Sequence, residues 1–315
     1  MNDVIKKRSC PVCNSNASQL IMKFTPELLA EINPTYKLGL LNDAIKNQLN
    51  LLTYSKCMDC NMVFCANEWT DETLTEVYQN VISHDKSNEK IFSIDKRIRL
   101  LHIWENILRI LKFKGYHSLE NLKVVDYGSG WGDLSHVIRG YGVSTVGYDS
   151  DTKKVQFARE SGIKVVNSLD DLQSMGQVDV FILKSVLEHV QDVDEILKTS
   201  YNLLKDDGIL VVEVTDYRKK YIEKNVQRLL AGVNVLSKNF NPIEHVNIYD
   251  YHSIKKTLKS YNYSIFSTDL ALRYSNLPGL RKLQVVVKVL NFLERISTCF
   301  ITGRELGITL YAIKN

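Results

Sequence analysis

The sequence predicts an α/β protein built on a seven-stranded, mostly parallel sheet with helices on both faces, preceded by a small cysteine-rich domain. Three observations predict this fold. Short β-branched runs alternate with amphipathic stretches after Gly115, a glycine-rich turn follows the first of these runs, and two C-x-x-C pairs lie near the start of the chain. Alternating strand and helix patterns are typical of a parallel sheet whose strands are connected by helices.

Composition and charge narrow the class of protein. The 315 residues are 44% apolar and 24% charged, which is typical of a folded globular chain. A net charge of +4 is too small to indicate nucleic-acid binding. No apolar run reaches the roughly 18 residues of a membrane helix, and the first eight residues lack the apolar segment of a signal peptide. We therefore expect a cytoplasmic protein with no nucleic-acid partner and no transmembrane segment, and its oligomeric state stays open.

Changes in pattern divide the chain into three predicted regions. Residues 1–66 carry the cysteine pairs, and residues 67–118 form a helical connector and cap because their apolar side chains repeat at helical spacing. Residues 119–315 contain the sheet, with a helical insert at about 270–303 whose apolar repeat runs from Leu280 to Phe300. The seven predicted strands span residues 123–126, 145–149, 164–166, 178–183, 209–214, 264–266 and 307–313.

The most informative segment connects the first predicted strand to the next helix and reads Asp126-Tyr127-Gly128-Ser129-Gly130-Trp131-Gly132. Glycine at 128 and 130 lets the backbone turn tightly and come close to a ligand, because a Cβ would forbid the required dihedral angles. Asp149 ends the next strand, where a carboxylate can accept hydrogen bonds from both hydroxyls of a ribose. The loop and the acid together predict an adenosine-containing ligand, although glycines that serve packing alone would give the same pattern.

Two adenosine-containing ligands fit this arrangement, a nicotinamide dinucleotide and S-adenosyl-L-methionine. Dinucleotide sites use the spacing G-x-G-x-x-G. In this chain the glycines fall at 128, 130 and 132, and the hexapeptide ends in Asp133. The spacing therefore disfavours a nicotinamide-dependent oxidoreductase, which is kept as an alternative.

The loop heptapeptide resembles the first motif of class I S-adenosylmethionine-dependent methyltransferases, and Gly147-Tyr148-Asp149 resembles their second. The segment 183–212 resembles their fourth-strand motif with the following helix and strand. The resemblance covers residues 122–311 and implies a Rossmann-like methyltransferase fold with S-adenosyl-L-methionine as cofactor. It also implies the residues that bind this cofactor, which are Asp126, Gly128, Ser129, Gly130, Gly132, Asp149, Ser150, Ser168, Leu169 and Lys184.

The cysteine pairs Cys10–Cys13 and Cys57–Cys60 can each present two thiolates to one tetrahedral ion. In a reducing compartment, this clustering favours a metal over disulfides. Four thiolates would form a closed, structural zinc site that performs no chemistry. The 43 residues between the pairs exceed the usual spacing of about 15 to 20, so a single shared zinc is not required, and Cys65 is an alternative ligand.

Methyl transfer requires that the acceptor be positioned and, in most cases, deprotonated. The segment Asn241-Pro242-Ile243-Glu244-His245-Val246 follows the fifth predicted strand, so we expect it over the carboxyl edge of the sheet. Cysteine knuckles before a class I core resemble the zinc-containing methyltransferases of deoxysugar and surface-glycan biosynthesis, in which a Glu-His pair serves deprotonation. This resemblance implies that Glu244 and His245 are catalytic, with His245 as the general base. A histidine that only caps a helix is the alternative.

The sequence therefore predicts an S-adenosylmethionine-dependent methyltransferase that acts on a nucleotide-linked sugar or a surface-glycan precursor. Methylation of oxygen and methylation of carbon both stay open. Besides the oxidoreductase, the remaining alternative is a non-catalytic binding module that keeps the fold. Glu188 and His189, which follow the fourth strand, are predicted to serve local structure.

Overall fold

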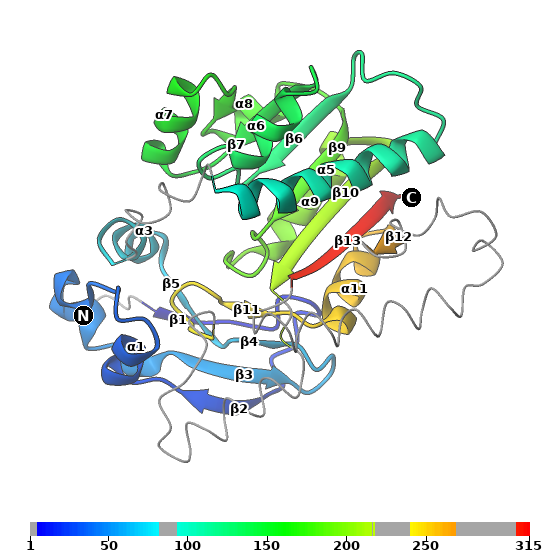
Figure 1. The fold of residues 1–315 in the computed structure, drawn as a ribbon. Helices are drawn as coiled ribbons and strands as arrows, with labels where there is room; N and C mark the ends of the chain where they lie inside the picture. The colour runs from blue at the N-terminus through cyan, green and yellow to red at the C-terminus, as the bar shows by residue number, and fades with distance from the viewer. Residues whose placement is uncertain (1–4, 82–92, 216, 218–239, 269–306) are drawn as a thin grey trace. The chain divides into compact units, whose positions relative to one another are not determined.

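The computed structural model describes residues 5–81, 93–215, 217, 240–268 and 307–315 (Figure 1). The chain forms two compact units. The first unit combines Met1–Lys86, Leu187–Glu195 and Thr215–Thr257, and the second combines Ser87–Val186, Ile196–Val214 and Leu258–Asn315. The predicted insert at about 270–303 lies outside the described residues. None of the described helices is long and apolar enough to cross a membrane.

The central sheet of the second unit confirms the predicted fold. Within the described residues it has seven strands in the order β12-β13-β10-β9-β6-β7-β8 (Figure 1). Strands β10, β9, β6, β7 and β8 pair in parallel, whereas β12 and β13 pair antiparallel. The strands are β6 (Lys123–Tyr127), β7 (Ser144–Tyr148), β8 (Val165–Val166), β9 (Val178–Lys184), β10 (Leu204–Thr215), β12 (Tyr263–Thr268) and β13 (Gly307–Lys314).

One strand begins earlier than its sequence pattern indicates. β10 starts at Leu204, although the β-branched run that predicts it starts at Ile209. The pairing register with β9 shifts between Leu204 and Ile209, and Asp207 has a φ of 60°. Polar residues in an irregular stretch of strand give no alternating pattern, which is why the sequence does not reveal this start.

Helices precede or follow the strands of this sheet along the chain, and two of them, α5 and α6, contribute side chains to the main core of the unit. They are α5 (Ile94–Phe113), α6 (Asp133–Arg139), α7 (Thr152–Glu160), α8 (Leu169–Gln173), α9 (Val193–Leu203) and α11 (Tyr251–Ser260). The side chain of Ser93 caps α5 by accepting a hydrogen bond from the backbone of Lys96. One face of this helix, which includes Leu100, Trp104 and Ile107, is buried in the main core of the unit.

The first unit has a four-stranded sheet in the order β11-β4-β3-β2 and a two-stranded sheet of β1 and β5. Its strands are β1 (Ile5–Lys7), β2 (Ser18–Lys23), β3 (Thr53–Cys57), β4 (Val63–Cys65), β5 (Asn67–Trp69) and β11 (Asn247–Ile248). Its helices are α1 (Pro26–Ile32), α2 (Asp43–Lys46) and α3 (Asp71–Asn80), with 3-10 turns η1 (Leu38–Leu40) and η2 (Leu49–Leu51).

A late segment of the chain completes this first unit. β11 pairs antiparallel with β4, so that Asn247 lies opposite Phe64. Ile243 and Val246 are buried in the same core as Phe24, Leu29 and Tyr54. The structure therefore assigns the Glu244-His245 segment to the first unit, because its apolar residues complete that core.

Candidate functional site

The glycine loop between β6 and α6 uses glycine for two different reasons. Gly128 has a φ of 69°, and a Cβ there would lie 2.5 Å from Cγ2 of Val186. Gly130 has a φ of 56°, but a Cβ there would meet nothing within 4 Å. Glycine at 128 is thus required by packing as well as by its dihedral angles, whereas Gly130 lies beside open space into which a ligand can approach.

Asp149 holds the loop from the end of β7. One of its carboxylate oxygens accepts a hydrogen bond of 2.8 Å from the backbone N–H of Gly130, and the other accepts one of 2.9 Å from Asp151. The backbone N–H of Ser129 also donates to the carbonyl of Tyr148 over 2.9 Å. Each carboxylate oxygen of Asp149 keeps acceptor capacity beyond these single bonds.

Asp126 lies behind the loop and is buried. The hydroxyl of Ser135 on α6 donates a hydrogen bond of 2.8 Å to its carboxyl group. Burial raises the pKa of Asp126 to about 6, and the hydrogen bond from Ser135 and the charge of Lys184 act in the opposite direction. The carboxyl group therefore connects β6 to the first turn of α6 and helps to fix the loop between them.

The other predicted cofactor residues lie at the carboxyl ends of neighbouring strands. Ser150 is exposed after β7, Ser168 and Leu169 begin α8 after β8, and Lys184 ends β9. The ammonium group of Lys184 lies 3.8 Å from a carboxylate oxygen of Glu213 on β10. Because these strands are parallel, the second unit brings the whole predicted set to one edge of its sheet.

The four knuckle cysteines come together in the first unit. The sulfur atoms of Cys10, Cys13, Cys57 and Cys60 all lie within 4.8 Å of one another. Four thiolates held about 2.3 Å from a tetrahedral ion would stand roughly 3.8 Å apart, so one ion fits this cluster. Cys65 does not belong to the cluster, because it is buried in the apolar core on β4.

Two asparagines shape the knuckles. Asn14 follows Cys13 and Asn61 follows Cys60, and both have positive φ, at 56° and 63°. Their backbone N–H groups donate to the carbonyls of Cys10 and Cys57 over 2.8 and 3.0 Å. Asparagine tolerates this left-handed conformation, which turns each pair of thiols toward the same point.

Asn241 shapes the turn that carries the predicted catalytic pair. Its side-chain oxygen accepts hydrogen bonds from the backbone N–H groups of Ile243 and Glu244, over 3.1 and 2.9 Å. Its backbone carbonyl accepts from the N–H of His245 over 3.0 Å. Asn241 is 1% exposed, so the turn is built from a buried side chain.

Three tyrosines that the sequence patterns do not predict contact the predicted catalytic pair. The hydroxyl of Tyr217 lies 2.8 Å from Nδ1 of His245, and the hydroxyl of Tyr36 lies 2.5 Å from Oε1 of Glu244. Tyr54 donates to the backbone carbonyl of His245 over 2.6 Å. No local pattern predicts these contacts, because even the nearest of these tyrosines, Tyr217, lies 28 residues from His245 in sequence.

His189 lies beside His245 in the same unit. The centroids of the two rings are 4.6 Å apart. Nδ1 of His189 is 2.9 Å from the backbone carbonyl of Glu244. Because a carbonyl only accepts hydrogen bonds, this nitrogen carries a proton. The buried carboxyl group of Glu188 accepts from the backbone and hydroxyl of Thr215, over 3.3 and 3.4 Å.

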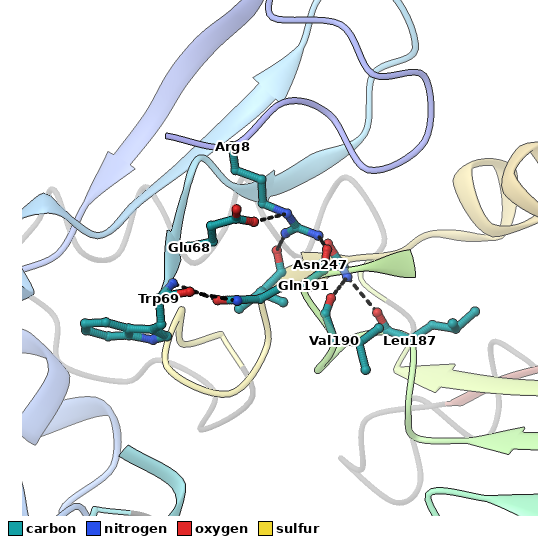
Figure 2. A network of polar contacts seen from close by, with 8 residues as sticks. Arg8, Glu68, Trp69, Leu187, Val190, Gln191 and Asn247 are labelled. Atoms are coloured by element: carbon teal, nitrogen blue, oxygen red, sulfur yellow. Dashed lines mark hydrogen bonds and ion pairs between the residues drawn. The ribbon is translucent and has the colours of Figure 1, made fainter. Parts of the chain in front are cut away.

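A polar network holds the segment 187–191 against β11 and the N-terminal strands (Figure 2). The side-chain amide of Asn247 donates to the carbonyls of Leu187 and Val190, over 2.7 and 2.8 Å. The guanidinium of Arg8 donates to the carbonyls of Gln191 and Val246, and burial lowers its pKa. No sequence pattern predicts this network, although the network holds the chain on either side of His189.

Comparisons with known proteins indicate the family of this chain. A family model described as "Methyltransferase domain" matches residues 95–268, more than half of the chain. A ubiquinone biosynthesis O-methyltransferase of Pelagibacter ubique is 29% identical over 184 residues, which cover 53% of this chain and 77% of the relative. One of the same name from Agrobacterium fabrum is 30% identical over 131 residues, which cover 39% of this chain and 51% of the relative. The chain thus spans about half the length of the second relative.

The crystal structure of magnesium protoporphyrin IX methyltransferase from Synechocystis with bound SAH is 18% identical, with a TM-score of 0.49. The match covers 78% of this chain and 100% of that one. The family match does not favour the two alternatives considered above, the oxidoreductase and the non-catalytic module. The chain belongs to the class I S-adenosylmethionine-dependent methyltransferases.

Proposed function

We propose that this methyltransferase acts on a nucleotide-linked sugar or a surface-glycan precursor, with His245 as the general base and Glu244 as its catalytic partner. The observation that carries the proposal is that the cysteine cluster and Glu244-His245 belong to one compact unit. β11 begins two residues after His245 and pairs with β4, which begins three residues after Cys60. Knuckles and a Glu-His pair occur together in the zinc-containing methyltransferases that this sequence resembles.

The residues at the sheet edge suit S-adenosylmethionine, which supplies the electrophilic methyl group when it is bound. We assign its ribose to Asp149 and its methionine part to Gly128–Gly132, where Gly130 borders open space. The buried hydroxyl of Ser129 has no hydrogen-bond partner among the described residues, so a polar group of the cofactor would satisfy it. Ser150, Ser168, Leu169 and Lys184 complete the proposed set.

His245 would take the proton of the acceptor while the acceptor atom bonds the methyl carbon and the carbon–sulfur bond breaks. The hydroxyl of Tyr217 lies 2.8 Å from Nδ1 of His245, and we assign to this contact the orientation of the imidazole ring. A positioned general base contributes about 10²- to 10⁴-fold to a rate. The same base serves an acceptor hydroxyl or an acidic C–H, so the proposal covers oxygen and carbon methylation.

The test is methyl transfer from radiolabelled S-adenosylmethionine to a pooled nucleotide-sugar extract. We expect His245→Ala to lower kcat about 10²- to 10⁴-fold and to leave the calorimetric affinity for S-adenosylhomocysteine unchanged. His117→Ala, at an exposed histidine of the second unit, is the matched control and should behave as wild type. Asp149→Ala should instead lose affinity for S-adenosylhomocysteine. Unchanged turnover in His245→Ala would remove this residue from the mechanism.

The names of the relatives supply a second candidate, an oxygen methylation in ubiquinone biosynthesis. The matched family region, residues 95–268, contains the glycine loop and Glu244-His245 but not the knuckle cysteines. Ubiquinone precursors therefore form a second arm of the acceptor screen. Methylation in that arm alone would replace the sugar proposal while leaving the assignment of His245 in place.

We also propose that Cys10, Cys13, Cys57 and Cys60 bind one structural zinc ion. The mutual distances of their four sulfurs support this proposal. Four thiolate ligands leave no open position on the metal, so the ion would stabilise the first unit without taking part in methyl transfer.

A further inference from the structure

We propose that Tyr36 is a positioning residue, whose hydroxyl fixes the Glu244 side chain and the turn that carries it. This inference rests on the proposed function, because it assumes that Glu244 acts with His245. Tyr36 lies between α1 and η1, more than 200 residues from Glu244 in sequence. It has no place in the motifs from which the catalytic pair was predicted.

The hydroxyl of Tyr36 contacts both groups that define the turn. It lies 2.5 Å from Oε1 of Glu244 and 2.8 Å from the side-chain oxygen of Asn241. That same oxygen of Asn241 accepts the backbone N–H groups of Ile243 and Glu244. Tyr36 thus contacts the carboxyl group of Glu244 and the side chain that orients its backbone.

The surroundings of Tyr36 make it a permanent hydrogen-bond donor. Its side chain is 7% exposed and packs in the core that also buries Ile243 and Val246. Burial and the charge of Glu244 raise the pKa of Tyr36, so the phenol keeps its proton. A protonated phenol can donate to a carboxylate but cannot act as a base, which fits a positioning role and excludes a role as proton acceptor.

Holding the carboxylate in advance should aid catalysis. Ordering a long charged side chain when substrate binds costs conformational entropy, and a side chain already held in place avoids that cost. Removing the hydroxyl should therefore lower kcat more than it changes KM. The expected loss is about 10- to 100-fold, as for one hydrogen bond to a charged group.

The decisive experiment is a double-mutant cycle of Tyr36→Phe and Glu244→Gln in the full chain. Methyl transfer to the pooled nucleotide-sugar extract is the activity measured. If Tyr36 acts through Glu244, Tyr36→Phe lowers kcat in the wild-type background and has little further effect in Glu244→Gln. Additive effects of the two substitutions on kcat would overturn the inference and leave the proposed function intact. A wild-type kcat in Tyr36→Phe, combined with a low kcat in Glu244→Gln, would do the same. A wild-type kcat in Glu244→Gln would instead overturn the assignment of Glu244, and the inference with it.

A second measurement does not depend on the acceptor. Amide hydrogen exchange at residues 241–245 should be about tenfold faster in Tyr36→Phe, because the turn loses a buried contact. Tyr263→Phe is the matched control, since its buried hydroxyl bonds Ser200 in another part of the chain and should leave this exchange unchanged. If the extract is not methylated, the sugar proposal fails, but the exchange measurement still tests the inference. Unchanged amide exchange at residues 241–245 in Tyr36→Phe would overturn it.

Discussion

The buried carboxyl group of Asp126 makes stability depend on pH. Its pKa is raised from 3.8 to about 6, chiefly by burial. The folded chain therefore binds this proton more tightly than the unfolded chain. As a result, the free energy of unfolding falls as pH rises through the window between these two values. A shift of about 2 units corresponds to about 3 kcal/mol, which is an upper estimate for this one group.

Asp126→Asn should remove this dependence. An asparagine oxygen can still accept the hydrogen bond from Ser135, and the amide carries no charge to desolvate. We expect the difference in unfolding free energy between about pH 4 and about pH 7 to shrink by up to about 3 kcal/mol, measured by urea unfolding. Asp170→Asn, at an exposed position on α8, is the control and should keep the wild-type difference. An Asp126→Asn variant with the wild-type pH dependence would contradict the prediction.

Single residues of the cofactor edge are predictable from sequence because their signals are local. The glycines of the loop and Asp149 stand at strand ends that the β-branched runs reveal. The contacts that surround Glu244 and His245 are different. Tyr36 and Tyr217 meet this pair through tertiary packing, and a tyrosine between two short helices carries no sequence signal of such a contact.

At the level of elements, the pattern predicts the strands of the large sheet well but misses the strands of the first unit, β1 to β5 and β11. The parallel strands of the large sheet are mostly buried and therefore appear in the sequence as apolar runs. β11 has only two residues, Asn247 and Ile248, and exists because β4 supplies its partner. A two-residue strand is too short to show a periodic pattern. Only the structure therefore reveals that β11 pairs with the N-terminal sheet.

Residues that are distant in sequence also hold the segment 187–191 in place. The substitution Asn247→Ala tests how much this contact stabilises the fold. The amide of Asn247 donates to two carbonyls of this segment, and the side chain is fully buried. Its loss leaves buried carbonyls without these donors, which should lower the free energy of unfolding by about 2 to 4 kcal/mol. Urea unfolding measures the effect.

Asn50→Ala provides the comparison for this element. Asn50 is exposed on η2, so its substitution should change the free energy of unfolding by less than about 0.5 kcal/mol. Equal stability of the two variants would show that the amide of Asn247 does not hold the segment.

At the scale of the whole molecule, the two units separate the proposed roles of the residues. The predicted cofactor residues belong to the second unit, whose main core contains no residue of the first. The cysteine cluster and the proposed catalytic pair belong to the first unit. Composition and local pattern cannot reveal this division, because the first unit is assembled from three stretches that are widely separated in sequence.

This division predicts what loss of the metal should do. Elemental analysis should find one zinc per chain in the wild-type protein and in Cys65→Ala, but much less in Cys57→Ser. Without the ion, the first unit should lose stability because its small sheets depend on the knuckles. Methyl transfer should then fall, while calorimetric binding of S-adenosylhomocysteine persists because Asp149 and the glycine loop belong to the other core. Full zinc content in Cys57→Ser would exclude the four-cysteine site, and loss of zinc in Cys65→Ala would move a ligand to Cys65.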